Sequence, residues 1–285
     1  MPELPEVETV VRALRLELIS HAFANVQVLW ERTVDRPAVT AFGAALRGAG
    51  VVDVTRRGKF IVLHLDTGQA LLVHLRMTGK LLIQLAVGAK PLAPDEDPYA
   101  RVILGLDDGR RLVFSDTRKF GRMYLVDDPL EVVGELGPEP LAADLGPERL
   151  TEMLAGRRGR IKSLLLNQSF IAGLGNIYTD EVLWRAGVHP LRPAGTLAPQ
   201  EVARLHRGIV SVLREAIADG GTSLRDNQYR QPDGDAGAYQ DLLAVYGRAG
   251  QACLRCGVTV ERLVVGQRGT HICPRCQVLP SHNSF

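Results

Sequence analysis

The hydrophobic pattern changes partway along the chain, from short apolar runs to a helical repeat. Between residues 51 and 126 the apolar runs have strand character and are bounded by turns such as Asp66-Thr67-Gly68 and Asp107-Asp108-Gly109. Their short spacing favours antiparallel pairing, so we expect a two-layer β sandwich or a flattened barrel. The predicted strands are residues 51–55, 60–65, 70–75, 101–106, 111–115 and 123–126.

Helical spacing is found at the N-terminus and throughout the second half. Pro5 stands at an early helical position and is followed by apolar residues at helical spacing as far as Leu18. A Gly/Pro-rich stretch, 134–147, separates the β-rich half from the helical half. We therefore expect an α+β protein whose helices include residues 151–155, 161–167, 177–187 with Asn176 as N-cap, and 199–219, followed by a polar, Gly-rich mobile loop at 221–237.

Length and composition limit the class of protein. With 285 residues, 46% of them hydrophobic and 23% charged, the chain is expected to be globular, with more than one domain, and neither disordered nor membrane-bound. Charged residues at Glu3, Glu6, Glu8 and Arg12 occupy the place where a secretory signal would have its apolar core. The expected location is therefore the cytoplasm.

Basic residues are unevenly distributed, although the net charge is only +2. Segment 56–80 holds five basic residues against one acidic residue, and 157–162 holds four basic residues and no acidic one. Segment 251–276 holds four arginines against Glu261. Each cluster alone is compatible with a solvated surface, but together they are typical of a protein that binds a polyanion such as nucleic acid.

The cysteines predict a metal site. Four cysteines form two Cys-x-x-Cys pairs, with 16 residues between the pairs. This spacing is typical of one tetrahedral Zn²⁺ held on a β hairpin. Since all four ligands come from the protein, we expect the metal to be structural, and catalysis to lie elsewhere. The predicted ligands are Cys253, Cys256, Cys273 and Cys276.

The N-terminus offers a nucleophile if Met1 is removed, as is usual before a small residue such as Pro2. The α-amine would titrate near pH 8, so part of it is unprotonated at neutral pH. A secondary amine that attacks an aldehydic carbon gives a charged iminium, which is an electron sink suited to elimination. Glu3, the next residue, is placed to act as an acid. By itself, Pro2-Glu3 is usually just a helix lead-in, so the functional interpretation depends on the motifs elsewhere in the chain.

Seven collinear segments resemble one family, the formamidopyrimidine-DNA glycosylases, which excise oxidised guanine in bacterial base-excision repair. The resemblance covers both halves of the chain in order, and together with the cysteine spacing it is very specific. The segments are MPELPEVET at the start, RRGKF at 56–60, HLRMTG at 74–79, DTRKFG at 116–121, NQSFIAGLGNIYTDE at 167–181, VYGRAGQAC at 245–253 and QRGTHICPRCQ at 267–277.

The resemblance implies a bifunctional DNA glycosylase and abasic-site lyase. It implies an N-terminal catalytic β-sandwich domain at 1–130, a helix-two-turn-helix domain with a lesion-recognition loop at 131–240, and a zinc finger at 241–285. By the family's pattern, Pro2 attacks the damaged nucleoside and Glu3 is the acid. Lys59 donates a proton for β-elimination, and Arg268 acts in δ-elimination.

The resemblance also implies contacts to double-stranded DNA that contains an oxidised purine, bound in a cleft between domains by a monomer associated with the nucleoid. An enzyme that acts on a base must flip it out of the duplex and fill the space. By the family's pattern, that task falls to Met77, Arg118 and Phe120. The other predicted DNA contacts are His74, Tyr99, Arg157, Lys162 and Asn176, although Tyr99 stands where relatives often carry histidine.

Two alternatives remain open at this point. The chain could be a non-catalytic DNA-binding module that uses its zinc finger and basic surface for binding alone. It could also share the fold but act on oxidised pyrimidines, as the sister endonuclease-VIII branch does. The segment MPELPE and the set Met77, Arg118 and Phe120 argue against the second alternative, by resemblance.

Overall fold

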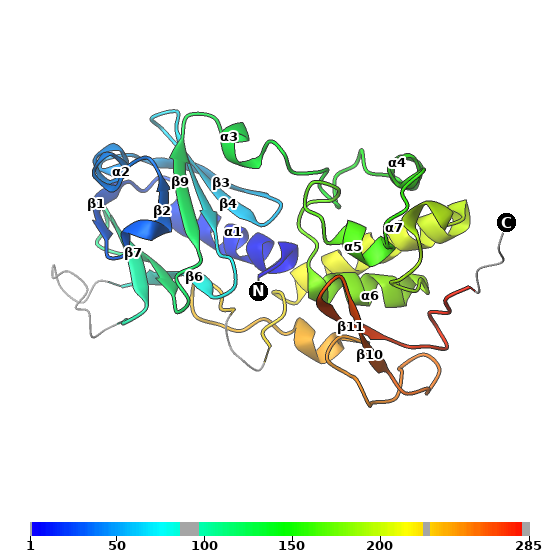
Figure 1. Ribbon diagram of the computed structural model, residues 1–285. Coiled ribbons are helices and arrows are strands. Elements are labelled where there is room, and N and C mark those ends of the chain that lie inside the picture. The colour runs from blue at the N-terminus through cyan, green and yellow to red at the C-terminus, as the bar shows by residue number, and fades with distance from the viewer. Residues whose placement is uncertain (1, 86–96, 225–228, 281–285) are drawn as a thin grey trace. The chain divides into compact units, whose positions relative to one another are not determined.

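The computed structural model describes residues 2–85, 97–224 and 229–280 of the chain (Figure 1). The chain divides into two compact units: Met1–Glu135 with Ile217–Gln240, and Leu136–Ala216 with Asp241–Phe285. The sequence predicts 217–240 as part of the second domain, 131–240. In the structure this segment groups with the first unit, because it docks on the N-terminal helix, as described below.

The first unit contains two sheets. One has the strand order β1 (Phe23–Val28), β7 (Ala100–Leu106), β8 (Arg111–Asp116) and β6 (Gly79–Gln84), and all its neighbours are antiparallel. The other has the order β2 (Val34–Arg36), β9 (Arg122–Val126), β5 (Ala70–His74), β4 (Phe60–Leu65) and β3 (Val51–Arg57), with β2 and β9 parallel. One hydrophobic core takes side chains from both sheets, which is the expected sandwich.

All six predicted strands are present, and each boundary lies within two residues of the prediction. The sequence did not reveal β1, β2 or β6. Strand β1 begins with a buried residue, followed by exposed and then partly buried ones, so buried and exposed positions do not alternate cleanly. Strand β2 is only three residues long. Such short or mixed segments become strands because a neighbouring strand pairs with them. The local hydrophobic pattern does not reveal this pairing.

Helix α1 (Leu4–Leu18) packs against β3 and β4. Val7, Val10 and Leu14 repeat at helical spacing and are fully buried in the sandwich core. The prediction of a helix close to the N-terminus is confirmed, with Glu3 as the N-cap and Pro5 in the first turn. The other helical segments described in this unit are η1 (Glu31–Thr33), α2 (Val39–Leu46) and α3 (Leu130–Val133), and η3 (Tyr239–Leu242) begins at its end.

The second unit combines helices with a β hairpin. Its helices are α4 (Pro147–Leu154), α5 (Ile161–Leu165), α6 (Asn176–Ala186), η2 (Ala194–Thr196) and the part of α7 (Pro199–Ala218) up to residue 216. Strands β10 (Glu261–Val265) and β11 (Arg268–Ile272) form the hairpin, and Figure 1 shows β11 beside α6.

The ends of α6 differ in part from the prediction. Gly187 ends the helix in the left-handed conformation, with φ 69°, as a glycine C-cap should. The N-cap, however, is Gly175 and not Asn176, which is the first helical residue. The backbone of Gly175 is extended, and the Asn176 side chain bonds elsewhere, so it does not cap its own helix.

Within the described part of the chain, no helix has both the length and the apolar character needed to cross a membrane.

Helix α1 offers a matched pair of leucines that tests how far the sandwich core depends on it. Leu14 is fully buried, whereas Leu16 is 86% exposed. We expect Leu14→Ala to lower the free energy of unfolding by about 2–5 kcal/mol, because it removes buried methyl groups and leaves a cavity. Leu16→Ala should change it by less than about 0.5 kcal/mol. Urea unfolding measures both, and equal losses would contradict this packing.

Candidate functional site

The first residues of the chain lie in a buried, hydrogen-bonded position at the start of α1. Pro2 is buried, and Glu3 is only 2% exposed. Glu3 and Glu6 form a capping box, in which the Glu3 backbone N–H donates to Glu6 Oε2 at 2.7 Å. The backbone next to the predicted nucleophile is therefore held by the carboxylate of Glu6.

Glu6 also anchors a distant segment of the same unit. Its other carboxylate oxygen, Oε1, accepts the backbone N–H of Thr222 at 2.7 Å. The hydroxyl of Tyr229 donates to the Gly220 carbonyl at 3.1 Å and, more weakly, to the Glu6 carbonyl at 3.4 Å. Gly221 has φ +81°, and a Cβ there would lie 2.9 Å from Glu6 Oε1. The start of the 221–237 segment thus fits closely against α1.

Sequence reasoning missed Glu6, which is 1% exposed. A signal was available, because Glu3 and Glu6 have the spacing of the two residues of a capping box, the N-cap and the third helical residue. The link to Thr222 had no sequence signal, because 216 residues separate the two positions. Within the segment itself, Arg225 and Asp226, which belong to the predicted lesion-recognition loop, lie outside the described residues.

Lys59 lies in the two-residue turn between β3 and β4, where Arg57 pairs with Phe60. Gly58 supplies the positive φ of 56° that this turn requires. The Lys59 side chain is largely buried, at 6% exposure. Arg56 supports the turn by donating to the Gly58 carbonyl at 3.1 Å, and its Nε donates to Glu8 at 2.9 Å.

His74 ends β5 directly opposite Phe60, and the two rings meet edge to face at 4.6 Å. Its Nδ1 accepts the backbone N–H of Arg76 at 2.9 Å. Burial, helped by the nearby charges of Arg76 and Lys59, lowers the pKa of His74 to about 3. The imidazole is therefore neutral at physiological pH and carries its proton on Nε2, since Nδ1 is the acceptor.

The predicted void-filling residues lie together on the surface of the first unit. Met77 and Phe120 are 39% and 46% exposed, so both present apolar surface to solvent. The guanidinium of Arg118 contacts both: Nη1 lies 3.2 Å from Met77 Sδ, and Cζ lies 4.7 Å from the centre of the Phe120 ring.

Asp116 shapes the turn that carries Arg118 and Phe120. This buried carboxylate accepts the hydroxyl of Thr78 and the backbone N–H groups of Arg118 and Gly121, the latter two at 3.1 and 2.8 Å. Tyr99 is 48% exposed, and its carbonyl accepts the backbone N–H of Asp116 at 2.8 Å. Asp116 therefore ties the Met77 turn to the 116–121 turn. It is a second positioning group that sequence reasoning did not single out.

In the second unit, Asn176 and Lys162 both point toward the β hairpin. Asn176 Nδ2 donates to the Gly269 carbonyl at 2.9 Å. Lys162 is fully buried, and its ammonium contacts Asp180 at 2.6 Å and Thr270 Oγ1 at 2.8 Å. The sequence led us to expect phosphate contacts from both residues. In this structure both side chains bond protein groups of the hairpin, and the phosphate contacts stay predictions.

Arg268 and Arg157 both have exposed side chains, as residues that contact a ligand should. Arg268 is the first residue of β11 and pairs with Val265 across the hairpin turn, which confirms its expected place beside the turn. Arg157 Cζ lies 5.9 Å from the centre of the Phe170 ring, and both residues line a pocket.

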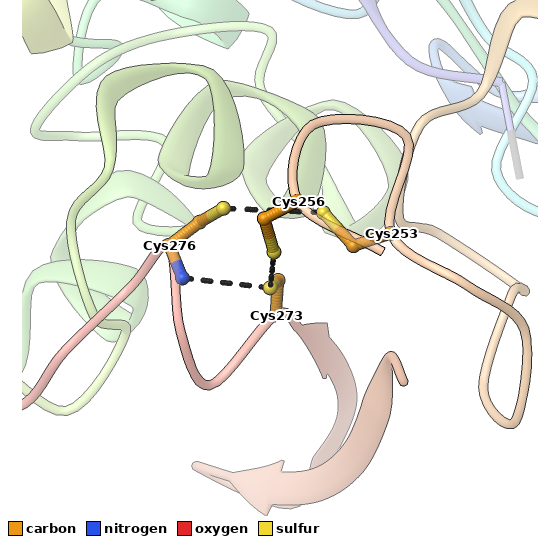
Figure 2. Close-up of side chains that lie close together, drawn as sticks. All are labelled: Cys253, Cys256, Cys273 and Cys276. Carbon is orange, nitrogen blue, oxygen red and sulfur yellow. Dashed lines mark hydrogen bonds between the residues drawn. The ribbon is translucent and has the colours of Figure 1, made fainter. Parts of the chain in front are cut away.

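The four cysteines converge, as Figure 2 shows. Their sulfur atoms all lie within 4.8 Å of one another, with Cys253 and Cys276 3.9 Å apart and Cys256 and Cys273 3.4 Å apart. Sulfurs about 3.8 Å apart are what a tetrahedral ion with metal–sulfur distances of about 2.3 Å requires.

The surroundings of the sulfurs suit a metal-bound thiolate. The indole N–H of Trp184 and the backbone N–H of Arg255 both donate to Cys253 Sγ at 3.4 Å, and the backbone N–H of Cys276 donates to Cys273 Sγ at 3.4 Å. Trp184 also packs in one apolar cluster with Val245, Val260 and the cysteines. The cysteine segment thus shares a core with α6.

Comparison with known proteins agrees with this arrangement. Residues 1–123 match the formamidopyrimidine-DNA glycosylase N-terminal domain, and 136–228 match the H2TH domain of the same enzymes. Residues 250–278 match the zinc finger found in these glycosylases and in isoleucyl-tRNA synthetase. The chain is 48% identical to a formamidopyrimidine-DNA glycosylase of Chloroflexus aggregans and 46% identical to one of Roseiflexus, with at least 97% of each chain covered.

Solved structures give the same result. The MutM (Fpg) protein of Thermus thermophilus is 41% identical, with a TM-score of 0.85 over 97% of this chain and 98% of that one. The Lactococcus lactis Fpg in complex with DNA containing an abasic site is 32% identical, with a TM-score of 0.87 over 97% of this chain and 100% of that one. The fold expected from the resemblance is confirmed, and the chain belongs to the formamidopyrimidine-DNA glycosylase family of DNA-repair enzymes.

Proposed function

We propose that this protein is a bifunctional glycosylase and abasic-site lyase that removes oxidised purines, 8-oxoguanine and formamidopyrimidines, from double-stranded DNA. The observation that carries the proposal is the placement of Pro2 and Glu3, buried and fixed by Glu6 at the start of α1. Support comes from relatives solved with DNA that contains a Fapy-dG or an abasic site.

The chemistry begins with the Pro2 nitrogen, once Met1 has been removed. This secondary amine attacks C1′ of the damaged nucleoside, so that a C1′–N bond to Pro2 forms and the bond to the base breaks. Glu3 supplies a proton to the departing group or to the ring oxygen. Ring opening then leaves an iminium between Pro2 and C1′, which draws electrons from the sugar.

Strand cleavage follows from that iminium. In β-elimination water takes a proton from C2′, a C2′–C3′ double bond forms and the C3′–O bond breaks. Lys59 is the proposed proton donor to the departing 3′ phosphate. A second elimination, from C4′, expels the 5′ phosphate, and Arg268 is assigned to it. The products are a one-nucleotide gap with phosphates at both sides and an unsaturated sugar fragment, which hydrolysis releases from Pro2.

Extrusion of the damaged base leaves a space that must be filled, because unstacking costs a few kcal/mol. Met77 and Phe120 offer apolar surface for that space, and Arg118 offers hydrogen-bond donors to the orphaned cytosine. Their exposure and mutual contacts support this assignment. Tyr99, Arg157 and Asn176 are proposed to contact the DNA backbone, for which Tyr99 and Arg157 have the required exposure.

We propose that His74 also contacts a phosphate, as a neutral donor. Because its Nδ1 is occupied by the Arg76 N–H, the free proton is on Nε2. A neutral donor orients a phosphate without adding charge, and Lys59 and Arg76 supply charge nearby.

The four-cysteine cluster is proposed to hold one Zn²⁺, through Cys253, Cys256, Cys273 and Cys276. With four protein ligands, the ion would stabilise the hairpin without activating water. Its contribution here is to give a short segment, which has only a small apolar cluster, a fixed fold.

Covalent trapping tests the proposed function directly. We expect borohydride to reduce the iminium and link the protein, with Met1 removed, to DNA that carries 8-oxoguanine opposite cytosine. Peptide mapping should place the link on Pro2. Pro2→Gly should still bind this DNA, but with most of the trapping and nicking lost, because the pyrrolidine nitrogen is absent. Intact-mass measurement verifies the N-terminus.

The same assay separates the alternatives. A non-catalytic DNA-binding module would bind the duplex and give neither adduct nor nick. An enzyme of the oxidised-pyrimidine branch would nick thymine glycol duplexes in preference to 8-oxoguanine duplexes.

Metal analysis tests the zinc assignment. We expect the purified protein to contain one zinc per chain, and Cys273→Ser to lose it together with DNA binding, because the hairpin loses a ligand. Leu254→Ala is the matched control: Leu254 lies between two of the cysteines and is 65% exposed, so zinc content and binding should persist. Full DNA affinity in a zinc-free protein would contradict the assignment.

The neutral state of His74 predicts a pH effect on stability. The folded protein protonates His74 only near pH 3, whereas the ordinary pKa is 6.5. Between these values the unfolded chain binds more protons, so the free energy of unfolding falls as the pH is lowered from about 6.5 to about 3. Urea unfolding of His74→Asn over this range should show a shallower fall. Parallel curves for both proteins would show that His74 is not held neutral by the fold.

A further inference from the structure

The backbone of Arg268 and Gly269 is held by a buried polar cluster in the second unit. Lys162 Nζ contacts Asp180 Oδ1 at 2.6 Å, Thr270 Oγ1 at 2.8 Å and the Gly269 carbonyl at 3.3 Å. Thr270 Oγ1, in turn, donates to the Arg268 carbonyl at 3.0 Å. Lys162, Asp180 and Thr270 are at most 1% exposed. Both carbonyls at the start of β11 are thus bonded to this cluster.

Helix α6 provides the fixed frame for the cluster. Asp180 accepts the ammonium of Lys162 on one carboxylate oxygen and the backbone N–H of His271 on the other, the latter at 2.9 Å. One turn earlier, Asn176 Nδ2 donates to the Gly269 carbonyl at 2.9 Å. Two side chains of one helix therefore fix two nearby peptide groups of β11, so the strand cannot slide along the helix without breaking these bonds.

Arg268 lies directly after the hairpin turn, so its position depends on the bonds that hold β11 to α6. Residues Gly266 and Gln267 form the two-residue turn, both with positive φ, and Arg268 follows at once with an exposed side chain. Because the side chain is exposed, what the fold fixes is the position of the backbone from which the guanidinium extends. The cluster fixes that backbone.

Stability alone does not account for such a cluster. Burying a charge pair costs desolvation energy, and well-packed apolar side chains of similar volume often serve folding as well or better. Lys162 is fully buried, so its ammonium is directed into the protein and away from the surface where a phosphate would lie. These polar groups form hydrogen bonds to particular backbone atoms of Arg268 and Gly269, which apolar side chains could not do.

We propose that Lys162, Asp180 and Thr270 are positioning residues, which hold the Arg268 backbone so that its guanidinium acts in δ-elimination, and that Lys162 is not a phosphate ligand. This inference rests on the proposed function, because it takes the role of Arg268 from there. It replaces the phosphate contact that the sequence suggested for Lys162.

An isosteric pair of variants at Thr270 gives the sharpest test. Thr270→Val keeps the shape but removes the hydroxyl between Lys162 and the Arg268 carbonyl, whereas Thr270→Ser keeps the hydroxyl. On DNA with a preformed abasic site, we expect Thr270→Val to lower the ratio of β,δ- to β-elimination product by about 3- to 10-fold. Thr270→Ser should match the unchanged protein. Arg268→Ala sets the lower limit of the ratio.

Two controls separate positioning from a general structural role. Zinc content and borohydride trapping should be equal in Thr270→Val, Thr270→Ser and the unchanged protein. An unchanged product ratio in Thr270→Val, or a parallel loss of trapping and of both eliminations, would overturn the inference. If the unchanged protein neither traps nor nicks, the proposed function itself fails, and the inference fails with it; the two failures are therefore distinguishable.

The salt dependence of DNA binding tests the second half of the proposal. A lysine that neutralises a phosphate contributes about one unit to the slope of log K against log salt concentration. We expect the double variant Lys162→Met with Asp180→Asn, which removes both buried charges, to keep the slope of the unchanged protein. A slope that falls by about one would show that Lys162 contacts phosphate and would overturn the assignment.

Discussion

The carboxylate of Glu6 is the constraint on which the first unit's site depends. One oxygen accepts the N–H of Glu3, next to Pro2, and the other accepts the N–H of Thr222, at the start of the 221–237 segment. Backbone N–H groups that donate to a buried carboxylate form charge-assisted hydrogen bonds, which are stronger than bonds between neutral groups. The same group therefore fixes both the start of the chain and a segment more than 200 residues away. Neither part can shift without breaking one of these two bonds.

The second unit uses the same principle with two consecutive acids of α6. Asp180 holds Lys162 and the β11 backbone. Glu181 accepts the backbone N–H groups of Ala244, Val245 and Tyr246 at 2.7–2.9 Å, and its burial raises its pKa. Asp180 thus attaches the hairpin to α6, and the adjacent Glu181 attaches the segment that precedes the cysteines to the same helix. Trp184, three residues after Glu181, completes this side of the helix by packing on the cysteine cluster.

The side chains proposed to contact DNA in the first unit include both a neutral imidazole and charged groups. His74 is neutral because it is partly buried beside Lys59 and Arg76, and its proton is directed by a backbone bond to Nδ1. Arg118, in contrast, is exposed and lies on Met77 and Phe120. In the free protein this apolar pair and the guanidinium between them are in contact with water, which is less favourable for the apolar surface than burial. The arrangement becomes favourable when stacked bases cover it, which suits a surface that replaces a flipped base.

The sequence alone determined six strands between 51 and 126, the N-terminal helix and the long helix near 199–219, the cysteine cluster and the family, because these depend on local periodicity and on motif spacing. It predicted Lys59, Arg118 and Arg268 as site residues, but it gave the wrong N-cap for α6 and no role for Glu6, Asp116 or Asp180. Those roles were decided by the tertiary structure. From the sequence alone, an acidic residue is expected at the surface. Its backbone hydrogen-bond partners become known only from the structure, and for Glu6 one of them is 216 positions away. The same holds for Lys162: only packing shows whether a lysine in a basic run faces solvent or, as here, a buried carboxylate.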